Sequence, residues 1–206
     1  MNFWFSFKNR GPSHAVTASA GELDGTVPYI AEFIAAIDRT ERFGFETRPR
    51  FLVEKECVDL QTILPVLLDY YDQHSPDELV GQTAAIHFAL LPRLYQKTGI
   101  PFELTIGWME REGKLIFRHD EELIRRFVRD GRKAWMSEGC PFHLWMTSPA
   151  CEILDITYAM NLGQARTRKR CPELIVYQRA HESATGSVYH PTLVGPGFFK
   201  STGAIL

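Results

Sequence analysis

The sequence predicts an α+β fold in which a buried central helix packs against an antiparallel β-sheet. Residues 81–99 carry apolar side chains around most of a helical surface, which is typical of a helix that is covered on nearly all sides. From residue 102 onward, apolar and polar residues alternate, as they do in half-buried strands. Two apolar runs at residues 141–147 and 151–157 flank a Ser-Pro-Ala segment, and this arrangement predicts a hairpin with a three-residue loop.

The composition is that of an ordinary globular protein. The 206 residues are 45% apolar and 23% charged, which is sufficient for one domain with its own hydrophobic core. We expect a single domain over residues 1–206, with an N-terminal helical lobe at residues 1–78 and a helix-plus-sheet core at residues 79–206. The net charge of −2 provides no general attraction to nucleic acid or to anionic membranes, so neither is an expected partner.

The cysteines and the apolar segments favour a cytoplasmic location. Four cysteines with no Cys-x-x-Cys pair are typical of a reducing compartment rather than of a disulfide framework. The aromatic N-terminal residues lack the basic start and the apolar core of a signal peptide. No stretch reaches the roughly 18 consecutive apolar residues of a membrane-spanning helix. The sequence gives no indication of the oligomeric state.

Helical periodicity recurs in the first third of the chain. Pro28 begins a pattern with one apolar stripe that ends near Arg42, and this pattern predicts the first helix. A second helix is predicted over residues 59–73, although Pro65 lies inside it. Residues 45–54, between the two helices, are rich in aromatic and β-branched residues and are consistent with an edge strand.

The remaining elements follow the buried helix. Gly99 ends that helix and Pro101 prevents it from restarting. The basic run at residues 166–170 is interpreted as a solvated loop. The sequence predicts strands at residues 102–109, 114–118, 141–147, 151–157, 173–179 and 188–193, and a charged helix at residues 121–128.

The predicted hairpin brings a histidine and an aspartate together. If its loop is centred on Pro149, His143 lies directly opposite Asp155, and both side chains point to the same face of the sheet. A carboxylate at this position can accept the imidazole N–H, fix the tautomer and leave the other ring nitrogen as a base. The alternative is a buried hydrogen bond or ion pair that only fixes the register of the hairpin.

A catalytic pair of this kind needs a nucleophile, and no cysteine is well placed to be one. Cys140 lies an odd number of residues from His143 and is expected to point to the opposite face. Cys151 is expected opposite Thr147, about 13 Å along the strand from the histidine. Cys57 precedes the second helix and has no local link to the hairpin. Buried structural thiols are the favoured interpretation for all four cysteines.

The order of these elements resembles the transglutaminase-like branch of the papain-fold cysteine enzymes over residues 81–157. The resemblance is carried by a buried helix ending in Gly99-Ile100-Pro101, a strand running to Gly107, the strand of His143 and the strand that contains Asp155 and Thr157. It implies that His143 is a general base and that Asp155 orients it. It also implies acyl transfer on an amide or peptide-like substrate, by hydrolysis, deamidation or transamidation.

The sequence departs from the family at the nucleophile. The family places a cysteine at the start of the buried helix, and counting back from Gly99 leads to Thr83 or Ala84, neither of which is a thiol. Three interpretations follow. Thr83 acts as the nucleophile while His143 removes its proton, or the chain is a non-catalytic relative that serves as a binding or interaction module, or an original cysteine has been replaced, for instance by Ala84.

Other residues are candidates for the walls of this site. The helix start from Gln82 to Ala84 is a candidate to stabilise an oxyanion, whereas residues 81–83 would alternatively only cap the helix. His87 lies one turn after the nucleophile position, although a lone histidine on an apolar helix is more often a core residue. Trp145 lies on the same strand face as the histidine and is expected either to wall a substrate cleft or to pack in the core.

No metal or other cofactor is predicted. Residues 119–122 read His-Asp-Glu-Glu, a dense run of potential ligands, but no zinc or EF-hand spacing is present. The run is explained as the capped, acidic first turn of a helix. The chain contains no phosphate-binding loop and no G-x-G-x-x-G motif, so nucleotide cofactors have no support.

Overall fold

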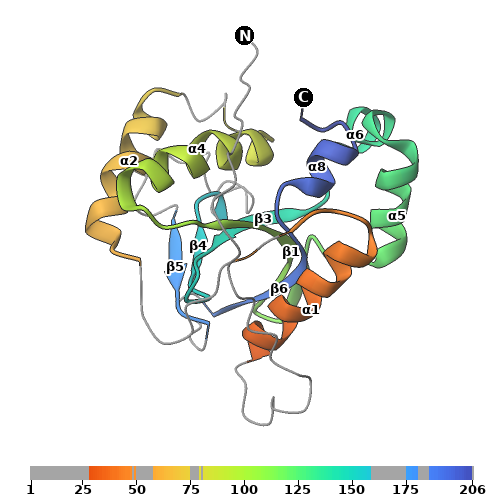
Figure 1. Ribbon diagram of the computed structural model, residues 1–206, viewed down its shortest axis with the longest axis horizontal. Coiled ribbons are helices and arrows are strands. Elements are labelled where there is room, and N and C mark those ends of the chain that lie inside the picture. The colour runs from red at the N-terminus through yellow and green to blue at the C-terminus, as the bar shows by residue number, and fades with distance from the viewer. Residues whose placement is uncertain are drawn as a thin grey trace, which may run out of the picture.

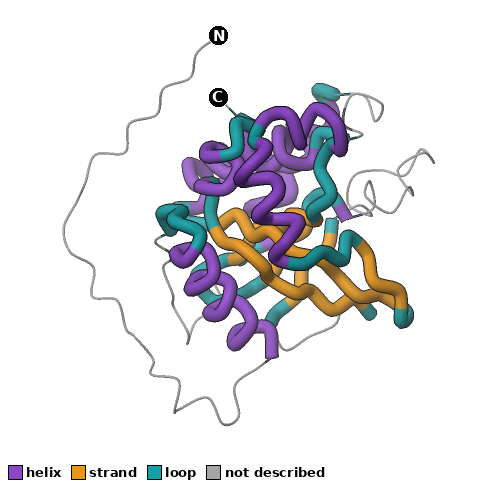
Figure 2. Tube along the Cα trace, turned by 90° about the vertical axis from the view of Figure 1, so that its right-hand side faces the viewer, coloured by secondary structure: helices purple, strands orange, loops and turns teal. Residues whose placement is uncertain are grey.

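The computed structural model has a mixed α+β architecture, with helices packed around an antiparallel sheet that curls into a half-barrel (Figures 1 and 2). It describes residues 28–47, 49, 58–74, 79, 81–158, 175–180 and 186–205. Within these ranges, no helix is long and apolar enough to cross a membrane. The helices are α1 (Pro28–Arg42), α2 (Leu60–Asp72), α4 (Thr83–Thr98), α5 (Glu121–Asp130), α6 (Arg132–Glu138) and α8 (Gly197–Ser201). The strands are β1 (Glu103–Arg111), β2 (Lys114–Ile116), β3 (His143–Thr147), β4 (Ile153–Asp155), β5 (Val176–Gln178) and β6 (Ser187–Val194).

The sheet is built around β1. The strand order is β2-β1-β3-β4-β5, and β6 also pairs with β1. β3 pairs with residues 103–107 of β1 and β2 with residues 109–111, whereas β6 pairs along residues 105–111. Because a strand has only two hydrogen-bonding edges, β6 occupies one edge of β1 while β2 and β3 share the other. β6 therefore lies beside the first strand although it follows β5 in the sequence.

Gly107 allows close contact with two neighbours of β1. A Cβ atom added at this position would lie 2.1 Å from the backbone oxygen of His190 and 2.5 Å from Cη2 of Trp145. The β1–β6 register also shifts between Ile106 and Gly107, as expected for a bulge at a glycine. The missing side chain thus lets the indole and the β6 backbone both lie against β1.

Three hydrophobic clusters hold the helices on the sheet. α2 and α4 pack together and against Met146 and Leu154. α1 packs against a second cluster that includes Trp145 and Tyr189. α5, α6 and α8 form the third cluster with Leu144. Successive side chains of β3 therefore alternate between the two faces of the sheet, as strand geometry requires.

Two expectations about the helices are corrected. α1 and α2 do not form one N-terminal lobe, because α1 packs along β6 whereas α2 packs on α4 in a different cluster (Figure 1). α4 is not covered on all sides: Ile86 and Leu90 are fully buried, whereas Tyr95 is 50% exposed. Alanine, proline and tyrosine tolerate contact with water, so an apolar composition did not imply complete burial.

The predicted element boundaries agree with the structure in most of the described chain. The helix expected over residues 59–73 is α2, and Asp59 caps it by accepting a hydrogen bond from the Gln61 amide. Residues 45–47 have no regular structure. The rest of the expected edge strand, apart from residue 49, lies outside the described residues, as do Cys57, Cys171 and the basic run at residues 166–170. α6 and α8 were not predicted, because they are too short to show a period of their own.

Candidate functional site

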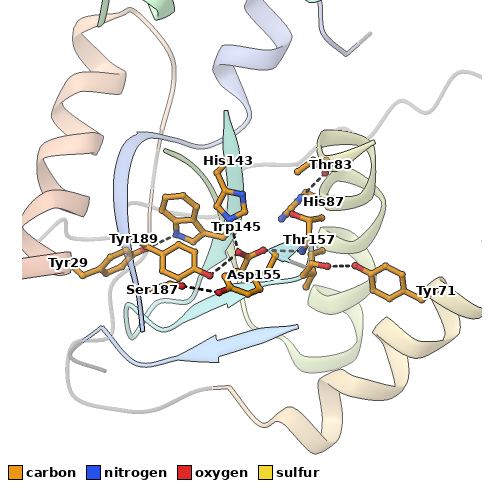
Figure 3. Close-up of polar contacts among 12 residues, drawn as sticks. Tyr29, Tyr71, Thr83, His87, His143, Trp145, Asp155, Thr157, Ser187 and Tyr189 are labelled. Atoms are coloured by element: carbon orange, nitrogen blue, oxygen red, sulfur yellow. Dashed lines mark hydrogen bonds and ion pairs between the residues drawn. The ribbon is translucent and has the colours of Figure 1, made fainter. Parts of the chain in front are cut away.

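His143 and Asp155 form a buried pair at the centre of the predicted site (Figure 3). His143 Nε2 lies 2.6 Å from Asp155 Oδ2, and neither side chain is exposed to solvent. An ionised carboxylate only accepts hydrogen bonds, so Nε2 carries the proton of this contact. Nδ1 is therefore the ring nitrogen through which His143 would exchange a proton with another group.

The two residues are diagonal neighbours in the hairpin rather than direct partners. Thr147 pairs with Ile153, so the register is shifted by two residues from the expected one, and the loop has five residues, 148–152, instead of three. The longer loop contains Cys151 in a left-handed conformation with φ 59°. Because a shift of two residues leaves every side chain on its own face, the His–Asp contact is retained. The expected pairing of Cys151 with Thr147 does not occur.

Three donors fix the Asp155 carboxylate. Besides the imidazole, the Tyr189 hydroxyl donates to the same Oδ2 atom at 2.9 Å, and the Thr157 amide donates to Oδ1 at 3.0 Å. The Thr157 contact gives the Asp-x-Thr pattern a structural meaning, because an aspartate in a turn commonly accepts from the amide two residues on. Burial and the nearby Asp155 charge hold the pKa of the Tyr189 phenol well above its ordinary value of 10, so the hydroxyl stays a donor.

Aromatic rings enclose the imidazole. The Trp145 ring lies 5.7 Å from the His143 ring between centroids, and Phe117 stacks on His143 at 5.7 Å with an interplanar angle of 11°. Trp145 is fully buried and donates its Nε1–H to the Tyr29 hydroxyl at 2.8 Å. It therefore packs in the core and does not line an open cleft. Phe117 has φ 58°, an unusual backbone conformation for a large side chain.

The start of α4, with Thr83 and His87, lies on the side of the His143–Asp155 pair that is opposite Tyr189 (Figure 3). Thr83 is buried, and His87, one turn later on the same helix face, donates from Nδ1 to the Thr83 carbonyl at 2.7 Å. Ala84 packs against the third hydrophobic cluster instead. Gln82 is the N-cap residue, but it is exposed and its side chain makes no capping bond. The Gln82 side chain therefore does not cap α4.

His87 is a buried imidazole with one unsatisfied nitrogen. Because Nδ1 donates to a carbonyl, Nε2 is unprotonated in the neutral ring, and this buried atom has no hydrogen-bond partner within the described part of the chain. Burial lowers the pKa of His87 from 6.5 to about 4, against the opposing effects of the Thr83 bond and the Asp155 charge. At neutral pH, His87 is thus an uncharged acceptor close to the His143–Asp155 pair.

We expect His87 to make folding sensitive to acid. Its pKa is lower in the folded chain than in the unfolded chain, so the unfolded state takes up the proton first, and stability is lost as the pH falls from 6.5 to about 4. The full shift corresponds to about 3 kcal/mol. His87→Leu should therefore flatten the acid limb when the free energy of urea unfolding is measured against pH.

His74→Leu is the matched control for this experiment. His74, just after α2, also bonds a carbonyl four residues earlier, from Nδ1 to Tyr70 O at 2.7 Å, but it is only partly buried. This variant should leave the acid limb in place. If His87→Leu lost stability below pH 6.5 as steeply as the wild type, the histidine would not be buried in its neutral form.

Two residues of the site were not predicted from the sequence. Tyr189 comes from β6, 34 residues from Asp155 in the sequence, and Phe117 comes from the segment after β2. The alternation within the expected strand at residues 188–193 could have placed Tyr189 on a buried face. No pattern in the sequence identifies Asp155 as its partner or places Phe117 on the imidazole.

Two described cysteines and one cavity are not part of the His143–Asp155 pair. Burial raises the pKa of the Cys140 thiol to about 11, and Cys151 is a buried cysteine in the hairpin loop. In the described ranges, no group of three or more His, Cys, Asp or Glu side chains is placed to hold a metal ion. A cavity of about 320 Å³ between α1, β6 and the segment before α5 is lined by residues including Trp108 and His190, but by neither member of the pair.

Comparison with known proteins assigns no family to the chain. No protein-family model matches it, and neither curated proteins nor solved structures gave a significant match. The site consists of an oriented imidazole, a fixed carboxylate and the start of α4 beside them.

Proposed function

We propose that the chain carries out acyl transfer on an amide or peptide-like substrate, by hydrolysis, deamidation or transamidation, at a transglutaminase-like site. The observation that carries the proposal is the 2.6 Å contact between His143 Nε2 and Asp155 Oδ2. A carboxylate held in this way fixes the imidazole tautomer and stabilises the imidazolium that forms during catalysis. The bonds from Thr157 and Tyr189 keep the carboxylate in the orientation that this role requires.

In the proposed reaction, Thr83 is the nucleophile. Its hydroxyl oxygen attacks the substrate carbonyl carbon while His143 Nδ1 takes the hydroxyl proton. The carbonyl electrons move to the oxygen, where Gln82 and the amides at the start of α4 stabilise the negative charge. When the intermediate collapses, the C–N bond breaks and the leaving amine takes the proton from His143. Water or a second amine then releases the acyl group from Thr83 by the same route.

A second candidate is a non-catalytic relative that acts as a binding or interaction module. The observation that favours it is the complete burial of both members of the pair, together with the Phe117 ring stacked on the imidazole. In this case the pair would serve to hold the hairpin against its neighbours. The two candidates differ in whether a small electrophile can react at residue 83 with the help of His143.

Thr83→Cys is expected to create a reactive thiol. An ordinary cysteine with a pKa of about 8.5 is only about 3% thiolate at pH 7, whereas a cysteine paired with a basic imidazole is largely ionised, so alkylation should be up to about 30-fold faster. The rate is measured with iodoacetamide by mass spectrometry of the peptide that contains residue 83, which separates it from the native cysteines. Adding His143→Gln should remove most of the gain.

Ala84→Cys is the matched control, because Ala84 is one residue away and packs against the third cluster. It should react no faster than an ordinary partly buried thiol, with or without His143. If Thr83→Cys reacted no faster than Ala84→Cys, or if His143→Gln had no effect on its rate, the acyl-transfer proposal would be wrong. The binding-module interpretation would then be the better one.

A further inference from the structure

We infer that Tyr189 is a positioning residue that sets how strongly Asp155 holds the His143 proton. The Tyr189 hydroxyl and the imidazole N–H both donate to Asp155 Oδ2, at 2.9 and 2.6 Å. Two donors on one carboxylate oxygen share its electron density, so each weakens the bond that the other can make. The phenol thereby lowers the basicity of His143 and favours the neutral, proton-accepting imidazole.

Two contacts and the burial of its ring aim the Tyr189 hydroxyl at the carboxylate. β6 pairs with β1 so that Tyr189 lies opposite Met109. The phenol ring meets the Trp145 ring edge-on, with 5.1 Å between centroids. The side chain is almost completely buried, and its hydroxyl points toward Asp155 from the side opposite α4 (Figure 3). The bond to Oδ2 therefore follows from the packing of β6 rather than from a mobile surface side chain.

Among the described residues, the titratable groups whose charges act on the pair or on Tyr189 include His87 from α4, Tyr29 from α1 and Tyr158 after β4. The pKa of His87 is lowered to about 4, and burial raises the pKa of Tyr29 and of Tyr189 above 10. The Tyr158 hydroxyl bonds to Ser187 Oγ at 3.0 Å rather than to the pair. His87, Tyr29 and Tyr189 are therefore not expected to titrate between about pH 5 and 9.

The inference deepens the proposed function, on which its catalytic meaning rests. A general base must be unprotonated at the working pH in order to accept a proton. A buried carboxylate at 2.6 Å favours the imidazolium, and the second donor on Oδ2 opposes that tendency. Tyr189 would thus extend the pH range of the base toward lower pH without touching the substrate.

The test is an NMR titration of the His143 ring protons in the full chain, with the resonance identified by its absence from His143→Gln. Tyr189→Phe removes only the hydroxyl and should raise the titration midpoint by ~0.5 to 1 pH unit. 3-Fluorotyrosine at position 189 is a stronger donor and should shift the midpoint downward. Tyr29→Phe is the matched control, because it removes a buried hydroxyl that bonds Trp145 and Thr147 but not Asp155, and it should leave the midpoint unchanged.

The inference is overturned if Tyr189→Phe leaves the midpoint unchanged or lowers it, or if Tyr29→Phe produces the same shift. If Tyr189→Phe does not fold, the fluorotyrosine protein keeps the hydroxyl and decides the question alone. The outcome is independent of labelling at residue 83. A shifted midpoint without faster labelling supports the role of Tyr189 and contradicts the acyl-transfer function. Faster labelling without a shift supports the acyl-transfer function and contradicts the role of Tyr189.

Discussion

Gly107→Ala is expected to destabilise the protein by more than about 4 kcal/mol, at the severe end of the range for single substitutions. The added Cβ would lie 2.1 Å from the His190 backbone oxygen and 2.5 Å from Trp145 Cη2. A flexible side chain could move away, but the His190 oxygen belongs to β6, and the Trp145 ring lies in a filled core. Either β6 must separate from β1 or the indole must leave its position beside His143. The free energy of urea unfolding measures the effect.

Gly113→Ala is the appropriate comparison for this variant. Gly113 also lies in the β1–β2 region and has φ 73°, but a Cβ there would meet nothing within 4 Å. Its replacement should cost only about 1 kcal/mol, from the left-handed backbone conformation. Equal losses in the two variants would mean that steric contact at Gly107 does not hold β6 and Trp145 in place.

Asp155→Ala is expected to lower the free energy of unfolding by about 3–5 kcal/mol, the usual loss when one partner of a buried ionic pair is removed. The substitution leaves three buried donors without their acceptor: His143 Nε2, the Tyr189 hydroxyl and the Thr157 amide. A buried donor that loses its partner retains the full cost of leaving water. Urea unfolding at neutral pH measures this loss.

The double variant His143→Ala/Asp155→Ala separates the pair from general damage to the core. If the two side chains interact as described, the double variant should lose less stability than the two single variants together, because each single variant already breaks the shared contact. Additive losses would show that the contact contributes nothing beyond the packing of its two members. The protein must remain folded in both single variants for this comparison, which circular dichroism verifies.

The sequence could predict what depends on local periodicity. The helix at residues 83–98 and its stop at Gly99 follow from apolar spacing and a left-handed C-cap. That His143 and Asp155 point to the same face follows from the two-residue period of strands. This prediction held although the predicted loop was two residues too short. A register shifted by two residues keeps the same face, so the contact was predicted correctly from an incorrect hairpin.

What the sequence could not predict depends on contacts between distant segments. The five-residue loop contains Cys151 in a left-handed backbone conformation, which a cysteine in the sequence does not predict. The sequence also could not predict that α1 and α2 pack on different parts of the core, because their apolar stripes look alike. Tyr189 reaches Asp155 only because β6 pairs with β1. None of these choices has a local signature.

The pairing of β6 with β1 has a consequence for the order of assembly. Thr105 pairs with Val194, so this part of the sheet forms only after a long stretch of intervening chain has been brought back. Pairings between such distant segments are slow steps of folding, because the entropy of closing the loop is lost before the contacts form. In a refolding experiment, the hydrogen bond from Tyr189 to Asp155 should form in the last kinetic phase. Chains that have not yet docked this edge would then hold an imidazole of different basicity from the mature protein.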